Sequence, residues 1–138
     1  MLVAGVTVKD GSRLDLEGKV KSFDDLVVWQ RAIALAKVVY GLQKLLPKEE
    51  RYAIGDQLRR AAVSVASNIA EGFGRDSAKD FMHFLLIARG SLYELRTQVT
   101  IARELGYLSD LEEFSALAAE EGRLLNAFIS KLRTQVSQ

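Results

Sequence analysis

A seven-residue apolar repeat between residues 81 and 102 constrains this chain more than any other feature. Its members alternate steps of four and three along the sequence: Phe81, Leu85, Ala88, Leu92, Leu95, Val99 and Ala102. This spacing forms a continuous apolar stripe on one side of a helix. We therefore predict a helix from Ser77 to Leu105, about 43 Å long at roughly 1.5 Å per residue. Ser77-x-x-Asp80 marks its start as a capping box, and Gly106 caps its end.

The segment before this helix predicts two further helices. The first follows a possible capping box, Ser22-Phe-Asp-Asp25, and ends at Pro47. It carries two apolar rows, which are Leu26, Trp29, Ile33, Ala36 and Tyr40, and Val28, Ala32, Leu35, Val39, Leu42 and Leu46. The second runs from about Lys48 to Glu71, with an unusually small centre at Ala61–Ser67 and Gly72 as its left-handed cap. Together these features offer more apolar surface than a simple two-helix contact requires.

A fourth helix is predicted to begin at the capping box Ser109-x-x-Glu112. Its core row is Leu111, Phe114, Ala118, Leu125, Phe128 and Leu132. Glu121 falls on the same row, where an apolar residue is expected. Two interpretations of Glu121 stay open: it pairs with a neighbouring arginine, or it marks an opening in the helix contact.

Four long helices joined by short turns predict an all-α fold, an antiparallel up-down-up-down four-helix bundle over residues 22–138. Residues 1–21 differ, because an Asp10-Gly11 turn signal lies between two short alternating runs. This segment is either a flexible leader or a short hairpin, since an isolated two-stranded hairpin is marginal in water.

Composition excludes several classes of function. The chain has no cysteine and one histidine, which removes disulfides, thiolate metal sites and most histidine metal sites. Nineteen basic against 18 acidic residues predict no strong general attraction to nucleic acid or to anionic membranes. No apolar stretch approaches the roughly 18–20 residues of a membrane-spanning helix, and we expect a cytoplasmic protein.

No catalytic constellation emerges from the sequence. His83 follows Asp80 by three residues, but the second copy that a di-iron bundle would need is missing. The run Gly72-Phe-Gly-Arg75 lacks the residues of a phosphate-binding loop and follows a helix. We expect a protein that is not an enzyme, with no cofactor, no metal and no small-molecule substrate.

A basic row is the remaining candidate for function. Arg89, Arg96 and Arg103 recur every seven residues beside the apolar stripe, with Tyr93 and Thr100 between them. Such a row can follow a phosphate backbone and stack a base. Further charge could come from Arg59, Arg60, Arg75 and Lys79. The alternative is that these arginines pair with Glu113 and Glu120, which have the same spacing.

Several motifs together resemble a known family. In order they are Phe23-x-x-Leu26-x-x-Trp29, Gln57-x-x-Arg60-Ala-Ala-x-Ser64, Asn68-Ile-Ala-Glu71-Gly72, Phe84-Leu-x-Ile-Ala-x-Gly-Ser-Leu-x-Glu-Leu95, Thr97-Gln98 and Leu105-Gly-Tyr107. The chain resembles the bacterial four-helix-bundle proteins encoded by intervening sequences in 23S ribosomal RNA genes. It is also similar to the accessory variability proteins of diversity-generating retroelements.

The resemblance implies a homopentamer of four-helix bundles, with RNA or DNA, a reverse transcriptase or another nucleoprotein component as partners. It supplies no catalytic residues. The retroelement proteins are markedly basic, whereas this chain is balanced. For the motif residues Trp29, Gln57, Ser64, Asn68, Glu71 and Gly72 we expect structural or interface roles, with hydrogen bonds across a helix or subunit contact.

The leading hypothesis is thus a non-enzymatic, homopentameric accessory factor associated with RNA or a nucleoprotein. The alternative is a structural or protein-interaction scaffold that binds no nucleic acid.

Overall fold

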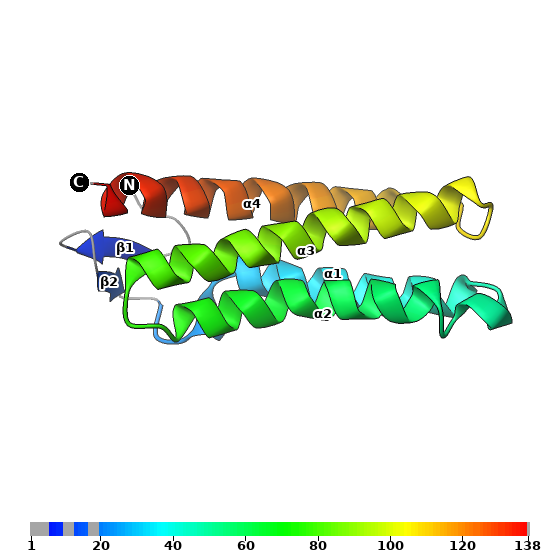
Figure 1. Cartoon of the computed structure of the whole chain (residues 1–138), viewed down its shortest axis with the longest axis horizontal. Helices are drawn as coiled ribbons and strands as arrows, with labels where there is room; N and C mark the ends of the chain where they lie inside the picture. The colour runs from blue at the N-terminus through cyan, green and yellow to red at the C-terminus, as the bar shows by residue number, and fades with distance from the viewer. Residues whose placement is uncertain (1–5, 10–12, 17–19, 138) are drawn as a thin grey trace.

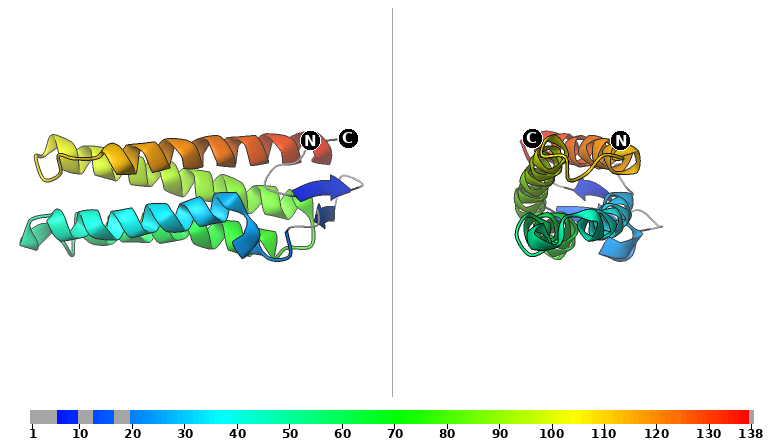
Figure 2. Two further views of the ribbon diagram at one scale, coloured as in Figure 1. Left: turned by 180° about the vertical axis from the view of Figure 1, so that it is seen from behind. Right: turned by 90° about the vertical axis from the view of Figure 1, so that its right-hand side faces the viewer.

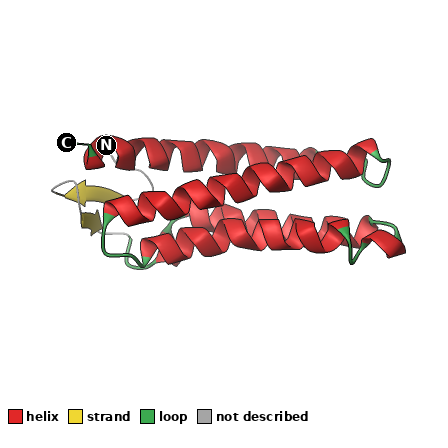
Figure 3. Ribbon diagram, viewed as in Figure 1, coloured by secondary structure: helices red, strands yellow, loops and turns green. Residues whose placement is uncertain are grey.

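The structure is a computed structural model that describes residues 6–9, 13–16 and 20–137. Its four long helices are α1 over Val27–Leu45, α2 over Ile54–Phe73, α3 over Ala78–Glu104 and α4 over Glu112–Val136. Short 3₁₀ turns precede the first two helices, η1 over Phe23–Asp25 and η2 over Lys48–Glu50. The predicted all-helical character of the main body is confirmed, and helices make up most of the described chain (Figure 3).

The N-terminal segment contains the hairpin that the sequence allowed. Strand β1 over Val6–Lys9 pairs antiparallel with β2 over Arg13–Leu16, and Val6 lies opposite Leu16. The Asp10-Gly11 turn falls outside the described residues. The hairpin lies at the end of the molecule where α4 finishes, and β1 contacts α4 (Figure 1).

The helices lie side by side along one long axis (Figure 1). The colour gradient reverses from each helix to the next, so sequence neighbours run in opposite directions. Seen along that axis, the four helices surround a common core (Figure 2). The α1–α2 and α3–α4 connections therefore share one end of the molecule, and the α2–α3 turn lies at the other end.

The seven-residue repeat of α3 forms the centre of this core, as predicted. All seven of its members are at most 2% exposed. The apolar row that begins at Leu26 behaves differently: Leu26 is buried, but Ile33 is 37% exposed and Tyr40 is 43% exposed. The other α1 row, which begins at Val28, faces the core. A wide apolar face on α1 thus leaves part of its surface in water.

Helix starts were predicted less accurately than the core. The Ser77 hydroxyl accepts from the Asp80 amide at 3.1 Å and caps α3 as expected. The Ser22 capping box instead closes the 3₁₀ turn η1, because the backbone of Leu26 is extended and α1 begins only at Val27. The prediction that Ser109 caps α4 is wrong, since this helix begins at Glu112 and the Glu112 amide donates to Asp110 at 3.4 Å.

The predicted boundaries of α2 were wrong at both ends. The helix begins at Ile54 rather than near Lys48, because the chain after Pro47 forms a 3₁₀ turn and Ala53 leaves the helical region. Gly72 is not a left-handed cap but lies inside the helix, which continues to Phe73. The described glycine with a positive φ is Gly106, at +80°, and it follows α3 as predicted.

Candidate nucleic-acid interface

The basic row of α3 lies along its border with α4. Arg89 donates from Nη1 to Asn126 Oδ1 on α4 at 3.1 Å, and Arg103 pairs with its neighbour Glu104 at 3.5 Å. The expected ladder with Glu113 and Glu120 is absent from the described residues, because Glu120 pairs with Arg31 on α1 at 3.1 Å. Arg96 is exposed, and its guanidinium has no hydrogen bond or ion pair with any residue that the structure describes.

Arg96 borders two hollows. The first, of about 400 Å³, lies on the outer side of α3 and is lined by Tyr93, Arg96, Thr97, Thr100 and Ile101. The second, of about 200 Å³, lies between α3 and α4, where Arg96 and Arg103 approach residues of the fourth helix. Tyr93 is 44% exposed, so its ring is open to a stacking partner. We call the surface formed by Tyr93, Arg96, Thr97, Thr100, Ile101 and Arg103 the α3 groove.

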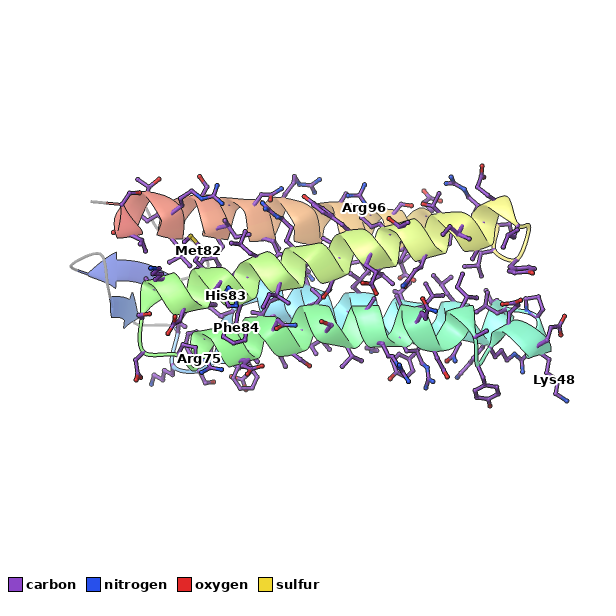
Figure 4. The ribbon with its side chains drawn as sticks, viewed as in Figure 1. Lys48, Arg75, Met82, His83, Phe84 and Arg96 are labelled. Atoms are coloured by element: carbon purple, nitrogen blue, oxygen red, sulfur yellow. The ribbon has the colours of Figure 1, made fainter. Side chains whose placement is uncertain are left out.

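The remaining basic candidates do not join this groove. Arg75 lies at the α2–α3 turn, whereas Arg96 lies farther along α3 on its α4 side (Figure 4). Arg75 pairs with Glu71 at 3.1 Å and stacks on Phe84 at 4.7 Å, and Lys79 is exposed nearby at the start of α3. Arg59 and Arg60 lie near the opposite end, on the first turns of α2. The predicted basic residues therefore form three separate groups.

The family motif residues meet α3 at a repeating spacing of seven. Gln57 and Ser64 on α2 bond to Gln98 and Ser91 on α3, and Glu71 is linked to Phe84 through Arg75. The first rung is a 3.4 Å hydrogen bond from Gln98 to Gln57, and the second joins the Ser64 and Ser91 hydroxyls at 2.7 Å. In the third, Arg75 pairs with Glu71 and covers the Phe84 ring. We call these three contacts the α2–α3 polar seam.

Other contacts strengthen the polar seam. The Asn68 amide donates to both the carbonyl and the hydroxyl of Ser64 at 2.9 Å. Gln98 also donates to Glu94 at 3.2 Å, although its own Oε1 has no partner among the described residues. These bonds lie within one chain, so a second subunit is not needed to explain them.

Gly72 and Trp29 also have packing roles. A Cβ added at Gly72 would lie 2.6 Å from the Phe84 Cβ and 2.9 Å from the Phe81 ring, so only glycine allows α2 and α3 to approach this closely. Trp29 is half-buried and meets Phe23 edge to face, with ring centroids 5.2 Å apart. These motif positions therefore support the end of the bundle that contains the α2–α3 turn.

Glu121 lies on the core row of α4 and is fully buried. Neither of its carboxyl oxygens has a hydrogen-bond partner among the described residues. Burial, and secondarily the charge of Glu120, raise the pKa of Glu121 from 4.5 to about 8, whereas Arg31 lowers it. Of the two interpretations from the sequence, neither holds within this chain: the nearby arginine pairs with Glu120, and full burial leaves no opening.

His83 lies on the exposed side of α3, beside the Phe84 ring (Figure 4). In the part of the chain that the structure describes, no three His, Asp or Glu side chains gather to hold a metal ion. Over the same residues, no helix is both long and apolar enough to cross a membrane.

Sequence reasoning missed the α3 half of the polar seam and the Arg31–Glu120 pair. A signal for the first was present, because positions 84, 91 and 98 mirror the spacing of 57, 64 and 71. Nothing comparable marked Arg31, whose partner depends on how α1 and α4 are placed.

Comparison with known families gives one match over most of the chain. A model described as 23S rRNA-intervening sequence protein matches residues 24–127. Among curated proteins, no match was found.

Comparison with solved structures finds chains of similar fold. Among them is the crystal structure of a protein of unknown function from the S23 ribosomal protein family of Bacteroides thetaiotaomicron. The sequences are 24% identical, the TM-score is 0.67, and the alignment covers 75% of this chain and 96% of that chain. At this identity, the likeness concerns the fold alone.

Proposed function

This chain belongs to the 23S rRNA-intervening sequence protein family, and from that premise we propose that it is a non-enzymatic accessory factor associated with RNA or a nucleoprotein. Its unit is an antiparallel up-down-up-down bundle, which assembles into a homopentamer in the cytoplasm. Partners of the assembly would be RNA or DNA and a protein that handles nucleic acid, such as a reverse transcriptase.

The α3 groove is the observation that carries this proposal. It combines an exposed aromatic ring, Tyr93, with an arginine, Arg96, that no described residue neutralises. Proteins that bind single-stranded nucleic acid use this pairing, because the ring stacks a base while the cation contacts phosphate. The Thr97 and Thr100 hydroxyls bond to carbonyls of their own helix, so the charge of the groove comes from its arginines.

Exposed apolar residues support self-association. Ile33 and Tyr40 on α1, and Ile87 and Ile101 on α3, are each more than a third exposed. Gly90 adds to this on α3: it is exposed, and a Cβ placed there would meet nothing within 4 Å. A mid-helix glycine costs about 1 kcal/mol relative to alanine, and contacts inside the chain give no reason for it.

Binding to a structured RNA, measured at increasing salt, tests the nucleic-acid role. We expect affinity to fall steeply with salt and to drop by at least about tenfold in the Arg89→Ala, Arg96→Ala double variant. The matched control is Lys37→Ala, Arg133→Ala, which removes the same charge from α1 and α4. No binding at low salt, or equal losses in both double variants, would contradict this role.

The same apolar surfaces favour a second candidate, a protein-interaction scaffold without nucleic-acid binding. Light scattering at micromolar concentration tests the assembly by itself, because a pentamer has five times the mass of one chain. A pentamer that does not bind RNA would favour the protein-interaction scaffold. A monomer would contradict the proposed pentameric assembly.

A further inference from the structure

A second basic hollow is lined by residues at the α1–α2 connection. This connection lies at the end of the bundle opposite the α2–α3 turn (Figure 1). The hollow measures about 460 Å³ and is lined by Gln43, Lys44, Arg51, Tyr52 and Arg59. The residues come from the last turns of α1, the link after η2 and the first turns of α2. We call it the turn hollow, and of its residues only Arg59 was a candidate from the sequence.

Arg51 is held in place on both its backbone and its side chain. Gln43 donates from Nε2 to the Arg51 carbonyl at 2.8 Å. Arg51 in turn donates from Nε to the Leu46 carbonyl at 3.2 Å. Its two terminal nitrogens make no hydrogen bond or ion pair with the described residues, so they remain available to a ligand.

Two more cations line the hollow. Arg59 is oriented by an ion pair with Asp56 and by the Tyr40 ring, whose centroid lies 5.8 Å from the guanidinium carbon. Lys44 is exposed and has no ion pair within the described part of the chain. Asp56 therefore offsets only one of three positive charges, which leaves an excess suited to an anion.

Tyr52 gives the turn hollow an exposed aromatic ring. It is 79% exposed, the largest exposed fraction among the described large hydrophobic side chains. An aromatic ring in water beside arginines offers a stacking surface to any planar base. The hollow also lies within the range of about 300–1,000 Å³ that small-ligand sites occupy.

We propose that the turn hollow binds a phosphate group attached to a nucleobase, as in a nucleoside monophosphate or the terminal nucleotide of a single strand. Arg51, Lys44 and Arg59 contact the phosphate, and Tyr52 stacks on the base. The inference goes beyond the proposed function, because it does not require the α3 groove.

Calorimetric titration with adenosine monophosphate, inorganic phosphate and adenosine tests this site on the full chain. We expect adenosine monophosphate to bind more tightly than inorganic phosphate or adenosine alone. Tyr52→Ala should weaken its binding about tenfold and leave phosphate unchanged, because base stacking is lost. Lys44→Gln should weaken both the monophosphate and phosphate severalfold, because it removes a phosphate contact.

Lys48→Gln is the matched control, since it removes one positive charge from the same connection. Lys48 lies at this end of the molecule but does not line the hollow (Figure 4). Binding should survive this change. Absence of saturable binding at millimolar monophosphate, equal affinity for adenosine, or an equal loss in Lys48→Gln would overturn the assignment. Circular dichroism of each variant separates loss of a contact from loss of the fold.

A short single-stranded RNA with and without a 5′-phosphate separates the two sources of the ligand. Tighter binding of the phosphorylated strand, competed by the monophosphate, would indicate a strand end. Binding of the monophosphate alone would indicate a free nucleotide. The Arg89→Ala, Arg96→Ala variant keeps the two proposals apart: it should retain monophosphate binding, and it would do so even if the α3 groove binds no RNA.

Discussion

The α2–α3 polar seam and the core around Glu121 differ in how their polar groups are satisfied: the seam's half-buried groups are paired, whereas the buried carboxyl of Glu121 is not. In the seam, the Ser64 and Ser91 hydroxyls bond to each other at 2.7 Å, and Asn68 adds a further donor to Ser64. On α4, Glu121 is fully buried, and both its oxygens lack a partner among the described residues. One region uses polar groups to join two helices, and the other carries a polar group that destabilises the contact.

The difference indicates that the seam fixes the alignment of two helices, whereas Glu121 makes stability depend on pH. Hydrogen bonds at a seven-residue spacing set the register of α2 against α3, because a shift by one residue would break all of them at once. Glu121 sets no register through bonding, and an apolar side chain there would pack at lower cost. Stability should therefore depend on pH through Glu121 and on close packing at the seam.

The largest expected effect is the pH dependence that Glu121 imposes. Its pKa is about 8 in the folded chain and near 4.5 when exposed, so the folded state binds the extra proton between these values. The protonated carboxyl is therefore tolerated below pH 4.5, and the folded state loses stability as the pH rises from 4.5 to 8. The upper limit of this loss is about 5 kcal/mol, measured by urea unfolding at a series of pH values.

Glu121→Gln tests the origin of that dependence, since the amide is similar in shape and does not titrate. The variant should unfold at the same urea concentration across the interval from pH 5 to 8. Glu121→Met should go further and exceed the wild type in stability at pH 8, because it places no polar atom in the core. A wild-type slope that persists in Glu121→Gln would assign the dependence to another group.

Gly72→Ala tests the close contact at the seam. The added Cβ would lie within 3.0 Å of both Phe84 and Phe81, so the helices must separate or the rings must move. Overpacking of this kind costs roughly 1–3 kcal/mol. Gly41→Ala is the matched control, since its Cβ meets nothing within 4 Å, and it should stabilise α1 by up to about 1 kcal/mol. Equal effects in thermal unfolding would disprove the close packing at Gly72.

Ser91→Ala measures the central rung of the seam. It removes the hydroxyl that bonds to Ser64 across the helix contact. We expect a loss of about 1 kcal/mol, typical of one hydrogen bond that is not fully buried. Ser67→Ala, at an exposed position of α2, should cost nothing, because alanine is the better helix former. A double-mutant cycle with Ser64→Ala isolates the pairwise energy, and a value near zero would contradict the rung.

These contrasts show which parts of the molecule the sequence could predict. The core stripe from Phe81 to Ala102 was predictable residue by residue, because helical periodicity alone decides which side of α3 is buried. The start of α2 was not, since the 3₁₀ turn after Pro47 and the backbone of Ala53 depend on how the connection closes. Local signals were also misleading, because Ser22 closes the 3₁₀ turn η1 rather than α1, and Ser109 does not cap α4.

The candidate site was harder to predict than the fold. Arg89, Arg96 and Arg103 lie in one row of α3, as their spacing predicts. Their partners differ from those expected, because Arg89 bonds to Asn126 and Glu120 pairs with Arg31. Tyr52 and Arg51 carried no periodic signal, because they lie in a connection where side-chain directions follow tertiary contacts. Pairing between helices depends on rotation and offset, which a single helical pattern does not contain.

The smallest expected effect on stability comes from Arg31, which pairs with Glu120 and acts electrostatically on Glu121. Its ion pair with Glu120 is 47% and 37% exposed on the two sides, so Arg31→Gln should cost only a few tenths of a kcal/mol at pH 7. Glu120→Gln removes the same ion pair and should cost about as much.

The pH dependence of stability distinguishes the two variants, because Arg31 lowers the pKa of Glu121 and Glu120 raises it. In Arg31→Gln the decline in stability should therefore extend to higher pH, whereas in Glu120→Gln it should end at lower pH. Urea unfolding from pH 5 to 10 measures both, and shifts in the same direction would show that the ion pair, rather than the individual charges, controls the buried carboxyl.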